Sequence, residues 1–211
     1  MEQTQQILTM LELQDSMNTK VHSNWRAQKF EFYRAIWVEC AELMDHYGWK
    51  WWQRQMPDTE QVALELVDIW HFGLSTLLQT GVTLEAIAER IERDLQLETN
   101  EPDFRLDLEA FACATLVDQR FHVAKFGRLM AGVGMSFEDL YRRYVGKNVL
   151  NFFRQDHGYK EGSYRKRWAD GREDNEHLVE LVQSLDARAP SFKQDLYQAL
   201  LGRYGRGRYG Q

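Results

Sequence analysis

Proline, cysteine and long apolar runs are scarce in this sequence, which has three prolines and two cysteines among 211 residues. Two cysteines are too few for a disulfide framework, and Cys40 and Cys113 are not spaced as a metal-binding pair. We therefore expect both to be core thiols in a reducing cytoplasm. The first ten residues show no basic start followed by an apolar stretch, so no secretory signal is expected, and no apolar run reaches membrane-spanning length.

The sequence also lacks an excess of positive charge, with 26 lysines and arginines against 32 acidic residues. The formal net charge is −6, which argues against a general nucleic-acid-binding protein, because phosphate contacts need a broad basic surface. The basic residues are unevenly distributed, and seven of them fall between Lys147 and Arg172. Such a segment can hold a small polyanion inside an otherwise acidic protein. We expect a small-molecule substrate, and neither nucleic acid nor a membrane as partner.

Strand signals are weak, and the helical period dominates the chain. Hydrophobic residues make up 44% of the sequence and recur at three- and four-residue intervals over most of its length. This pattern predicts an all-α fold in a single domain, residues 1–211. Helices are expected at about residues 4–20, 24–46, 57–80, 83 onward, 103–130, 136–156, 174–185 and 191–203. An ordered loop is predicted for 157–172, the core for about 4–186, and a C-terminal helix with a mobile tail for 187–211.

Four carboxylates occupy positions that the helical period assigns to the interior. Glu39 and Glu42 lie on the apolar stripe of one predicted helix, and Glu65 and Asp68 lie on the stripe of the next. Burying unpaired carboxylates costs several kcal/mol each, so either cations or basic side chains must lie between them. Oxygen ligands without cysteine favour Mg²⁺ or Mn²⁺ over zinc, and Mg²⁺ commonly binds a substrate's phosphates as well.

Two other interpretations of these acids stay open. The first is an ion-pair network with basic residues such as Lys125 and Arg128. The second is a di-iron centre, since Asp68 and His71 are three residues apart, although bundles of that kind need a Glu-x-x-His set twice. Two acid pairs on successive helices favour the magnesium interpretation over both.

Several short motifs resemble the dimeric dUTPases of the all-α NTP pyrophosphatase superfamily. They are Glu39-Cys-Ala-Glu42, Gly48-Trp-Lys-Trp51-Trp52, Glu65-Leu-Val-Asp68-Ile-Trp-His71-Phe72, and Asn148 to Tyr164 followed by Trp168, Gly171 and Glu173-Asp174-Asn175. Acid pairs alone are shared with MazG-type and dCTP pyrophosphatases, whereas the aromatic loop and the Gly-Tyr-Lys segment point to the dUTPase branch. The resemblance covers about residues 8–180. It implies a cytoplasmic homodimer that hydrolyses dUTP, and also dUDP, to dUMP with release of pyrophosphate or phosphate.

The resemblance also implies roles for individual residues. The implied metal ligands, for Mg²⁺ or for Mn²⁺ in its place, are Glu39, Glu42, Glu65, Asp68 and Asn151. Glu39 is expected to be the general base, although reasoning from the residues cannot choose it over Glu42. The implied phosphate-binding residues are Arg154, Tyr159, Lys160, Lys166 and Asn175. The alternative for the basic members of this set is a solvated surface loop.

Amide and aromatic side chains are candidates for binding the nucleoside. Gln14 and Asn18 interrupt the apolar stripe of the first predicted helix, and a carboxamide can match the edge of uracil, an N3 donor flanked by two carbonyl acceptors. Trp51, or Trp52, offers a stacking face. By resemblance His71 contacts the 3′-hydroxyl of deoxyribose. Structural roles for all of these side chains stay open.

Three functional hypotheses follow. Hydrolysis of dUTP is favoured over hydrolysis of another (d)NTP such as dCTP or a modified pyrimidine nucleotide. A helical regulator that binds nucleotide without turnover is the third, and the complete set of four acids argues against it. For the dimer, the apolar stretch Phe111–Met130 is a candidate interface, or else intramolecular core.

Overall fold

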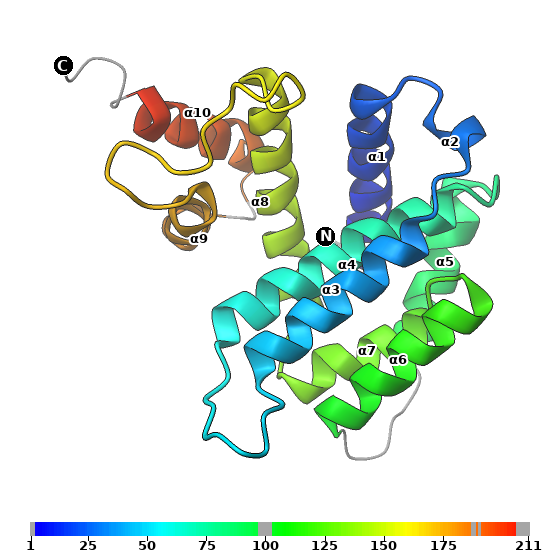
Figure 1. Ribbon diagram of the computed structural model, residues 1–211. Coiled ribbons are helices and arrows are strands. Elements are labelled where there is room, and N and C mark those ends of the chain that lie inside the picture. The colour runs from blue at the N-terminus through cyan, green and yellow to red at the C-terminus, as the bar shows by residue number, and fades with distance from the viewer. Residues whose placement is uncertain (1–2, 97–102, 187–188, 190, 206–211) are drawn as a thin grey trace. The chain divides into compact units, whose positions relative to one another are not determined.

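The computed structural model describes residues 3–96, 103–186, 189 and 191–205, and in these ranges the chain is helical (Figure 1). The only extended pairing among them is an isolated antiparallel bridge between Arg167 and Glu173. The prediction of an all-α fold is confirmed. No helix in the described residues is long and apolar enough to cross a membrane. The chain divides into two compact units, Met1–Tyr141 and Arg142–Gln211, and the expectation of a single domain stays a prediction.

The first unit is built from seven helices and the start of an eighth. They are α1 (Gln3–Val21), α2 (Trp25–Gln28), α3 (Phe32–Tyr47), α4 (Thr59–Leu78), α5 (Leu84–Leu95), α6 (Phe104–Asp118), α7 (Val123–Gly132) and the first residues of α8 (Phe137–Asp156). Helices α3 and α4 lie side by side along most of their length (Figure 1). Because α4 is apolar on nearly every side, it is the central helix of this unit.

The core of the first unit is aromatic where α4 meets α6 and α7. The Trp70 ring stacks on Phe126 with centroids 5.1 Å apart, and Phe111 and Phe121 pack around them. A Cβ at Gly73 would lie 2.7 Å from the Phe121 ring, so α4 can approach this ring only because position 73 is glycine. Phe111 and Phe126 have no exposed surface, which makes this part of the stretch intramolecular core.

Two predicted helices are broken in the structure. The helix expected at 24–46 is interrupted after α2 by Lys29, whose φ of 52° is left-handed, and the helix expected at 103–130 is interrupted at Gln119, with φ of 51°. A left-handed residue ends a helix, and apolar periodicity continues across it without a signal. Cys40 is buried as expected, but Cys113 is exposed, so the prediction of two core thiols is wrong for Cys113.

The second unit contains the rest of α8, α9 (Asp174–Ser184) and α10 (Phe192–Gly205). Its core is a cluster of aromatic rings around Phe153, which contacts Trp168, Tyr197 and Tyr204. The Glu173 side chain caps α9 in a capping box with Glu176. The predicted loop 157–172 has regular turns and the single bridge. Part of the predicted mobile tail, residues 206–211, lies outside the described residues.

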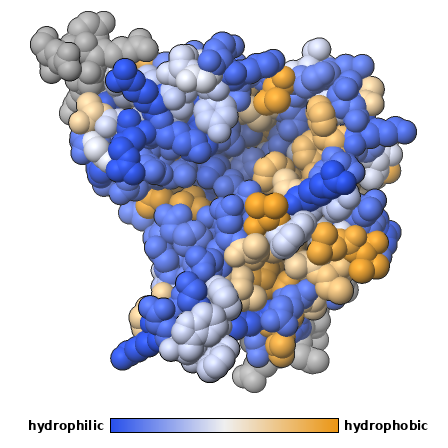
Figure 2. Space-filling model, viewed as in Figure 1, coloured by the Kyte–Doolittle hydropathy of each residue, from blue (hydrophilic) through white to orange (hydrophobic). Residues whose placement is uncertain are grey.

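The viewed surface is mainly hydrophilic, with apolar areas around α3 (Figure 2). Trp37 and Val38, on the outer side of this helix, are 43% and 48% exposed. They are two of several large apolar side chains that the first unit exposes. An exposed apolar area of this kind is typical of a protein interface.

Candidate active site

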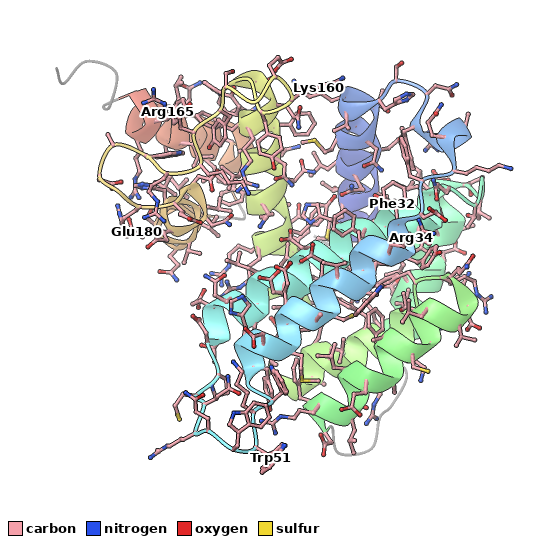
Figure 3. The ribbon with its side chains drawn as sticks, viewed as in Figure 1. Phe32, Arg34, Trp51, Lys160, Arg165 and Glu180 are labelled. Carbon is pink, nitrogen blue, oxygen red and sulfur yellow. The ribbon has the colours of Figure 1, made fainter. Side chains whose placement is uncertain are left out.

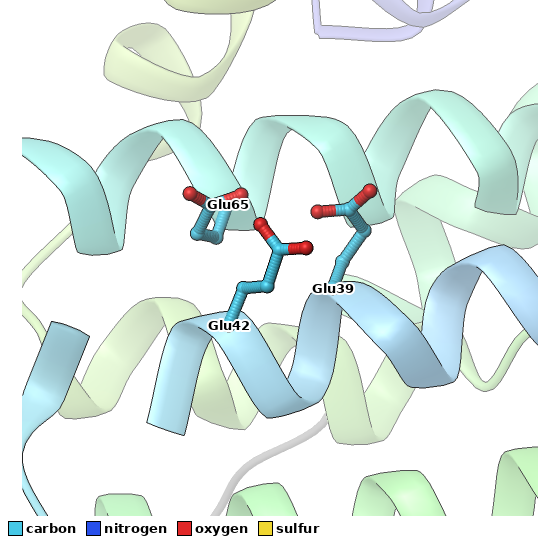
Figure 4. A group of neighbouring side chains, drawn as sticks. All are labelled: Glu39, Glu42 and Glu65. Atoms are coloured by element: carbon cyan, nitrogen blue, oxygen red, sulfur yellow. The ribbon is translucent and has the colours of Figure 1, made fainter. Parts of the chain in front are cut away.

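Three carboxylates meet where α3 and α4 run side by side (Figure 4). Glu39 and Glu42 are one helical turn apart on α3, and Glu65 is on α4. One oxygen from each of the three lies within 4.8 Å of the others. This acid cluster can share a single cation, and its all-oxygen donor set suits Mg²⁺ or Mn²⁺.

The other acids of this site act on Glu39 through their negative charges. The pKa of Glu39 is raised from its ordinary value of 4.5 to about 8, first by burial and then by the charge of Asp68, a hydrogen bond with Glu65, and the charges of Glu65 and Glu42. Glu39 is therefore protonated at neutral pH when no cation is bound. A cation among these carboxylates would relieve the repulsion, so the residues fit the metal that the sequence implied.

The acids are less buried than the helical pattern predicted. Glu65 is 8% exposed, Glu39 and Asp68 are half-buried, and Glu42 is exposed. The expectation of four interior carboxylates is wrong for Glu42, which is exposed although Cys40 and Leu43 beside it on α3 are buried. Asp68 lies one turn beyond Glu65 on α4 and acts on Glu39 through its charge, although it is not one of the three clustered residues.

The basic residues suggested as ion-pair partners of the acids, Lys125 and Arg128, have other surroundings. Arg128 binds Asp107 with Nε and Nη2, at 2.6 and 3.0 Å, and Lys125 is exposed. His46 is a neighbour of the acids, and its Nε2 lies 3.5 Å from an oxygen of Glu65. His71 bonds through Nδ1 to the carbonyl oxygen of Val67 at 2.8 Å, and it is not part of the acid cluster that could hold an ion.

The two amides of α1 converge on one hydroxyl of α4. Gln14 Nε2 and Asn18 Nδ2 donate to Ser75 Oγ at 3.0 and 2.9 Å, and Gln14 Nε2 also donates to Asn18 Oδ1 at 3.1 Å. Gln14 is 4% exposed, and Asn18 is half-buried. His71 is 5% exposed and one turn before Ser75. The structure thus brings Gln14, Asn18 and the His71 turn of α4 together.

Trp51 is not brought to these amides within the chain. It lies in the loop between α3 and α4 and is 89% exposed (Figure 3). Ser75 lies near the other end of α4, 16 residues after the first helical residue Thr59, or about 24 Å along the helix axis. Trp51 contacts the Trp52 ring edge-on, with centroids 5.5 Å apart.

In the second unit, a buried ion pair occupies the centre of the predicted phosphate segment. Arg154 Nε and Nη2 donate to the two oxygens of Asp174, both at 2.8 Å, and the Tyr164 hydroxyl donates to Asp174 at 2.8 Å. The side chains of Arg154 and Asp174 are 11% and 1% exposed. A bidentate pair of this kind holds the guanidinium in one orientation.

Two predicted asparagines surround this pair. Arg154 donates to the side-chain oxygens of Asn151 and Asn175 at 3.4 Å, and Lys147 Nζ donates to Asn175 Oδ1 at 3.4 Å. Tyr159 and Lys160 are exposed on the loop that follows α8, and Lys166 is exposed with its Nζ 6.0 Å from the centroid of the Tyr159 ring. The predicted residues of this unit therefore form two groups. Asn151, Arg154 and Asn175 lie in or around the buried ion pair, and Tyr159, Lys160 and Lys166 are exposed.

A family model described as dUTPase matches residues 6–159, well over half of the chain. The chain belongs to this dUTPase family. A search of the curated proteins found no match. Membership implies hydrolysis of dUTP, in keeping with the resemblance of the motifs.

The dUTPase match includes the acid cluster, the amides, His71 and Asn151, and it ends at Tyr159. The predicted residues beyond it are Lys160, Lys166 and Asn175. Sequence reasoning missed three partners of the predicted residues: Ser75, Lys147 and Asp174. Ser75 had a signal, because it follows His71 by one turn on the same stripe of α4. Lys147 and Asp174 were named only as members of the basic segment and of the last motif; their burial, at 6% and 1% exposed, was not predicted, since charged residues are rarely buried.

Proposed function

We propose that this dUTPase requires Mg²⁺, which Mn²⁺ can replace, and that it converts dUTP to dUMP and pyrophosphate and dUDP to dUMP and phosphate. Such an activity limits the incorporation of uracil into DNA and supplies dUMP. The observation that supports a divalent cation is the acid cluster, whose three carboxylates repel one another and share one space.

Glu39, Glu42 and Glu65 would hold the metal, and Asp68 and Asn151 are proposed as further ligands. When bound, Mg²⁺ lowers the pKa of a water molecule and neutralises charge on the phosphates. Glu39 is proposed to accept the proton of the attacking water. Its pKa of about 8 without metal means that it is ready for this role only when positive charge has displaced its proton.

Basic and polar side chains of the second unit are proposed to bind the phosphates. The members of this set are Arg154, Tyr159, Lys160, Lys166 and Asn175. The exposed Lys160 and Lys166 can reach a ligand directly, since they stand on a loop with glycines at 158 and 162. Arg154 already binds Asp174, so it contributes an oriented positive charge near Asn151 and Asn175.

The nucleoside contacts are proposed for the first unit. Gln14 and Asn18 would pair with the edge of uracil. Because His71 Nδ1 donates to a carbonyl, the hydrogen of the neutral ring is on Nδ1, and Nε2 can accept from a 3′-hydroxyl. Trp51 is proposed to stack on the base. It is far from Ser75 in its own chain, so in the proposed homodimer this ring would come from the partner.

The test of the proposed function is release of pyrophosphate or phosphate from a panel of dUTP, dUDP, dCTP, dTTP and UTP, with Mg²⁺ and with EDTA. We expect turnover of dUTP and dUDP that EDTA abolishes and that added Mg²⁺ or Mn²⁺ restores. Cleavage of dCTP but not of dUTP would assign another substrate to the same chemistry. Binding of nucleotide without any turnover would support a regulator.

A homodimer in the cytoplasm is also proposed. The exposed Trp37 and Val38 give a first surface to test. Analytical ultracentrifugation should show a mass near twice 25.0 kDa, and Val38→Asp should shift the equilibrium toward the monomer. A monomer at all protein concentrations would contradict the proposal.

A further inference from the structure

Ser75 contacts the side-chain amides of Gln14 and Asn18, the two residues proposed to bind the base. Ser75 has no exposed surface, and its hydroxyl oxygen takes part in three hydrogen bonds. The hydroxyl donates its hydrogen to the carbonyl oxygen of His71, one turn back on α4, at 3.0 Å. The oxygen is thereby left to act only as an acceptor toward α1.

An acceptor at this point fixes the orientation of the amides. Gln14 and Asn18 both turn their NH₂ groups toward Ser75 Oγ, at 3.0 and 2.9 Å. Gln14 Nε2 gives its second hydrogen to Asn18 Oδ1, so both of its hydrogens have acceptors inside the protein. The carbonyl oxygen of Gln14 therefore points away from Ser75, and one hydrogen on Asn18 Nδ2 points away as well.

We infer that Ser75 is a positioning residue that sets the base preference of the enzyme, an inference that rests on the proposed function. The oriented pair presents one carbonyl oxygen, whose two lone pairs can accept more than one hydrogen bond, and one N–H donor. Uracil matches this pattern, because its N3–H can donate to Gln14 and a neighbouring carbonyl can accept from Asn18. Cytosine has the reverse pattern, an N3 acceptor beside an amino donor, and would set acceptor against acceptor.

Loss of the Ser75 acceptor frees the amides to rotate by half a turn. Each carboxamide can then present either its oxygen or its nitrogen to a base, because the two ends are nearly the same in shape. A site that no longer holds one orientation loses affinity for uracil and loses its penalty against cytosine. Discrimination by hydrogen-bond polarity is strong when the polar groups are buried and fixed, and here Gln14 and Ser75 are buried.

The test compares kcat/KM for dUTP and for dCTP in wild type, Ser75→Ala and Thr76→Ala. Thr76 is the matched control, since its hydroxyl bonds the carbonyl oxygen of Phe72 at 2.9 Å in the same way, without touching the amides. Ser75→Ala should lower the dUTP-to-dCTP preference about tenfold or more, with kcat for dUTP much less affected. Thr76→Ala should leave the preference unchanged.

A double-mutant cycle makes the test specific. In a Gln14→Ala, Asn18→Ala background, adding Ser75→Ala should cause no further loss of preference, because the groups that it orients are absent. An equal loss of activity on both nucleotides in Ser75→Ala, with the preference intact, would overturn the inference and assign Ser75 a purely structural role.

Two provisions keep the outcome decisive. If Ser75→Ala does not fold, Ser75→Cys is measured, since sulfur fills the space but accepts hydrogen bonds weakly, and an unchanged preference in that variant overturns the inference equally. A wild-type protein that does not hydrolyse dUTP contradicts the proposed function itself. If the wild type prefers dUTP and Ser75→Ala keeps the same preference, the inference about Ser75 is contradicted and the proposed function is not.

Discussion

The acid cluster of the first unit and the Asp174 ion pair of the second unit differ in the neighbours of their buried carboxylates. Asp174 is 1% exposed, and Arg154 and Tyr164 supply three hydrogen bonds to its carboxylate. Glu65 is 8% exposed, its near neighbours include two more carboxylates, and His46 Nε2 lies 3.5 Å from one of its oxygens. The fold surrounds one carboxylate with hydrogen-bond donors and gathers three carboxylates in the other place.

This difference separates a structural site from a functional one. A buried charge with complete partners stabilises one arrangement of the chain and has little left to offer a ligand. A group of like charges is unfavourable in the folded protein and persists because something in the functional state balances it. The four predictions below test the two halves of this contrast, in order of decreasing effect.

The largest effect is expected from Glu42→Gln. Removing one charge from the acid cluster should lower kcat for dUTP by at least about a hundredfold at saturating Mg²⁺, because a ligand of the cation is lost. Metal-free stability should be unchanged or higher, since repulsion falls. Kinetics with circular dichroism measure both quantities, and Glu89→Gln, an exposed glutamate on α5, is the control. A large loss of helicity without metal would instead support a structural ion-pair network.

The second prediction concerns the balanced site. Asp174→Asn leaves the Arg154 guanidinium buried without its charged partner, which should cost about 3–5 kcal/mol in the free energy of unfolding. Chemical denaturation followed by circular dichroism measures the change. If stability were unaffected, the Arg154–Asp174 pair would not stabilise this unit, and a role for Arg154 in directly binding phosphate would gain support.

The third prediction uses the raised pKa of Glu39, about 8 against an ordinary 4.5. Between these values the folded protein holds a proton that the unfolded chain has lost, so stability must fall as pH rises through this window. In EDTA, the melting temperature should therefore decrease from pH 6 to pH 8. Glu39→Gln should flatten this dependence, and Mg²⁺ at pH 8 should restore the melting temperature of the wild type. A pH-independent wild type would contradict the repulsion within the acid cluster.

The smallest effect is expected where balanced charges are exposed. Glu180 accepts hydrogen bonds from Arg172 and Arg203, but its side chain is 48% exposed (Figure 3). Water already solvates these groups, so Glu180→Gln should destabilise the protein far less than Asp174→Asn does. The small loss of stability caused by Glu180→Gln should vanish as the salt concentration is raised. Denaturation at low and high ionic strength measures it. A salt-independent loss as large as that of Asp174→Asn would show that burial is not what separates the two sites.

Local sequence signals predicted the helices well and their interruptions poorly. The ends of α1, α4 and α8 lie within about two residues of the expected limits, because caps, glycines and apolar spacing act locally. Lys29 and Gln119 adopt left-handed conformations in the middle of predicted helices. Nothing in either residue type requires that conformation, so the tertiary packing of the neighbouring helices decides it.

The candidate site was predicted in its residues and only partly in its geometry. Spacing placed Glu39 and Glu42 on one face of a helix, and the structure confirms that both lie with Glu65. Spacing along the sequence could not show that Glu42 is exposed, because burial depends on which other helices pack against α3. Nor could it show that Trp51 is far along α4 from Gln14, since distance between segments is not contained in spacing along the chain.

The sequence by itself determined the helical class, the acid pairs and the amides of α1, because periodicity and spacing fix which residues share a face of a helix. Only the tertiary structure decided which charges meet partners. Arg154 and Asp174 are 20 residues apart and Ser75 is 57 residues from Asn18, and such contacts form when separate helices pack. Electrostatic balance is a property of three-dimensional neighbours. The clustered acids and the oriented amides therefore became distinguishable from structural polar groups only in the folded protein.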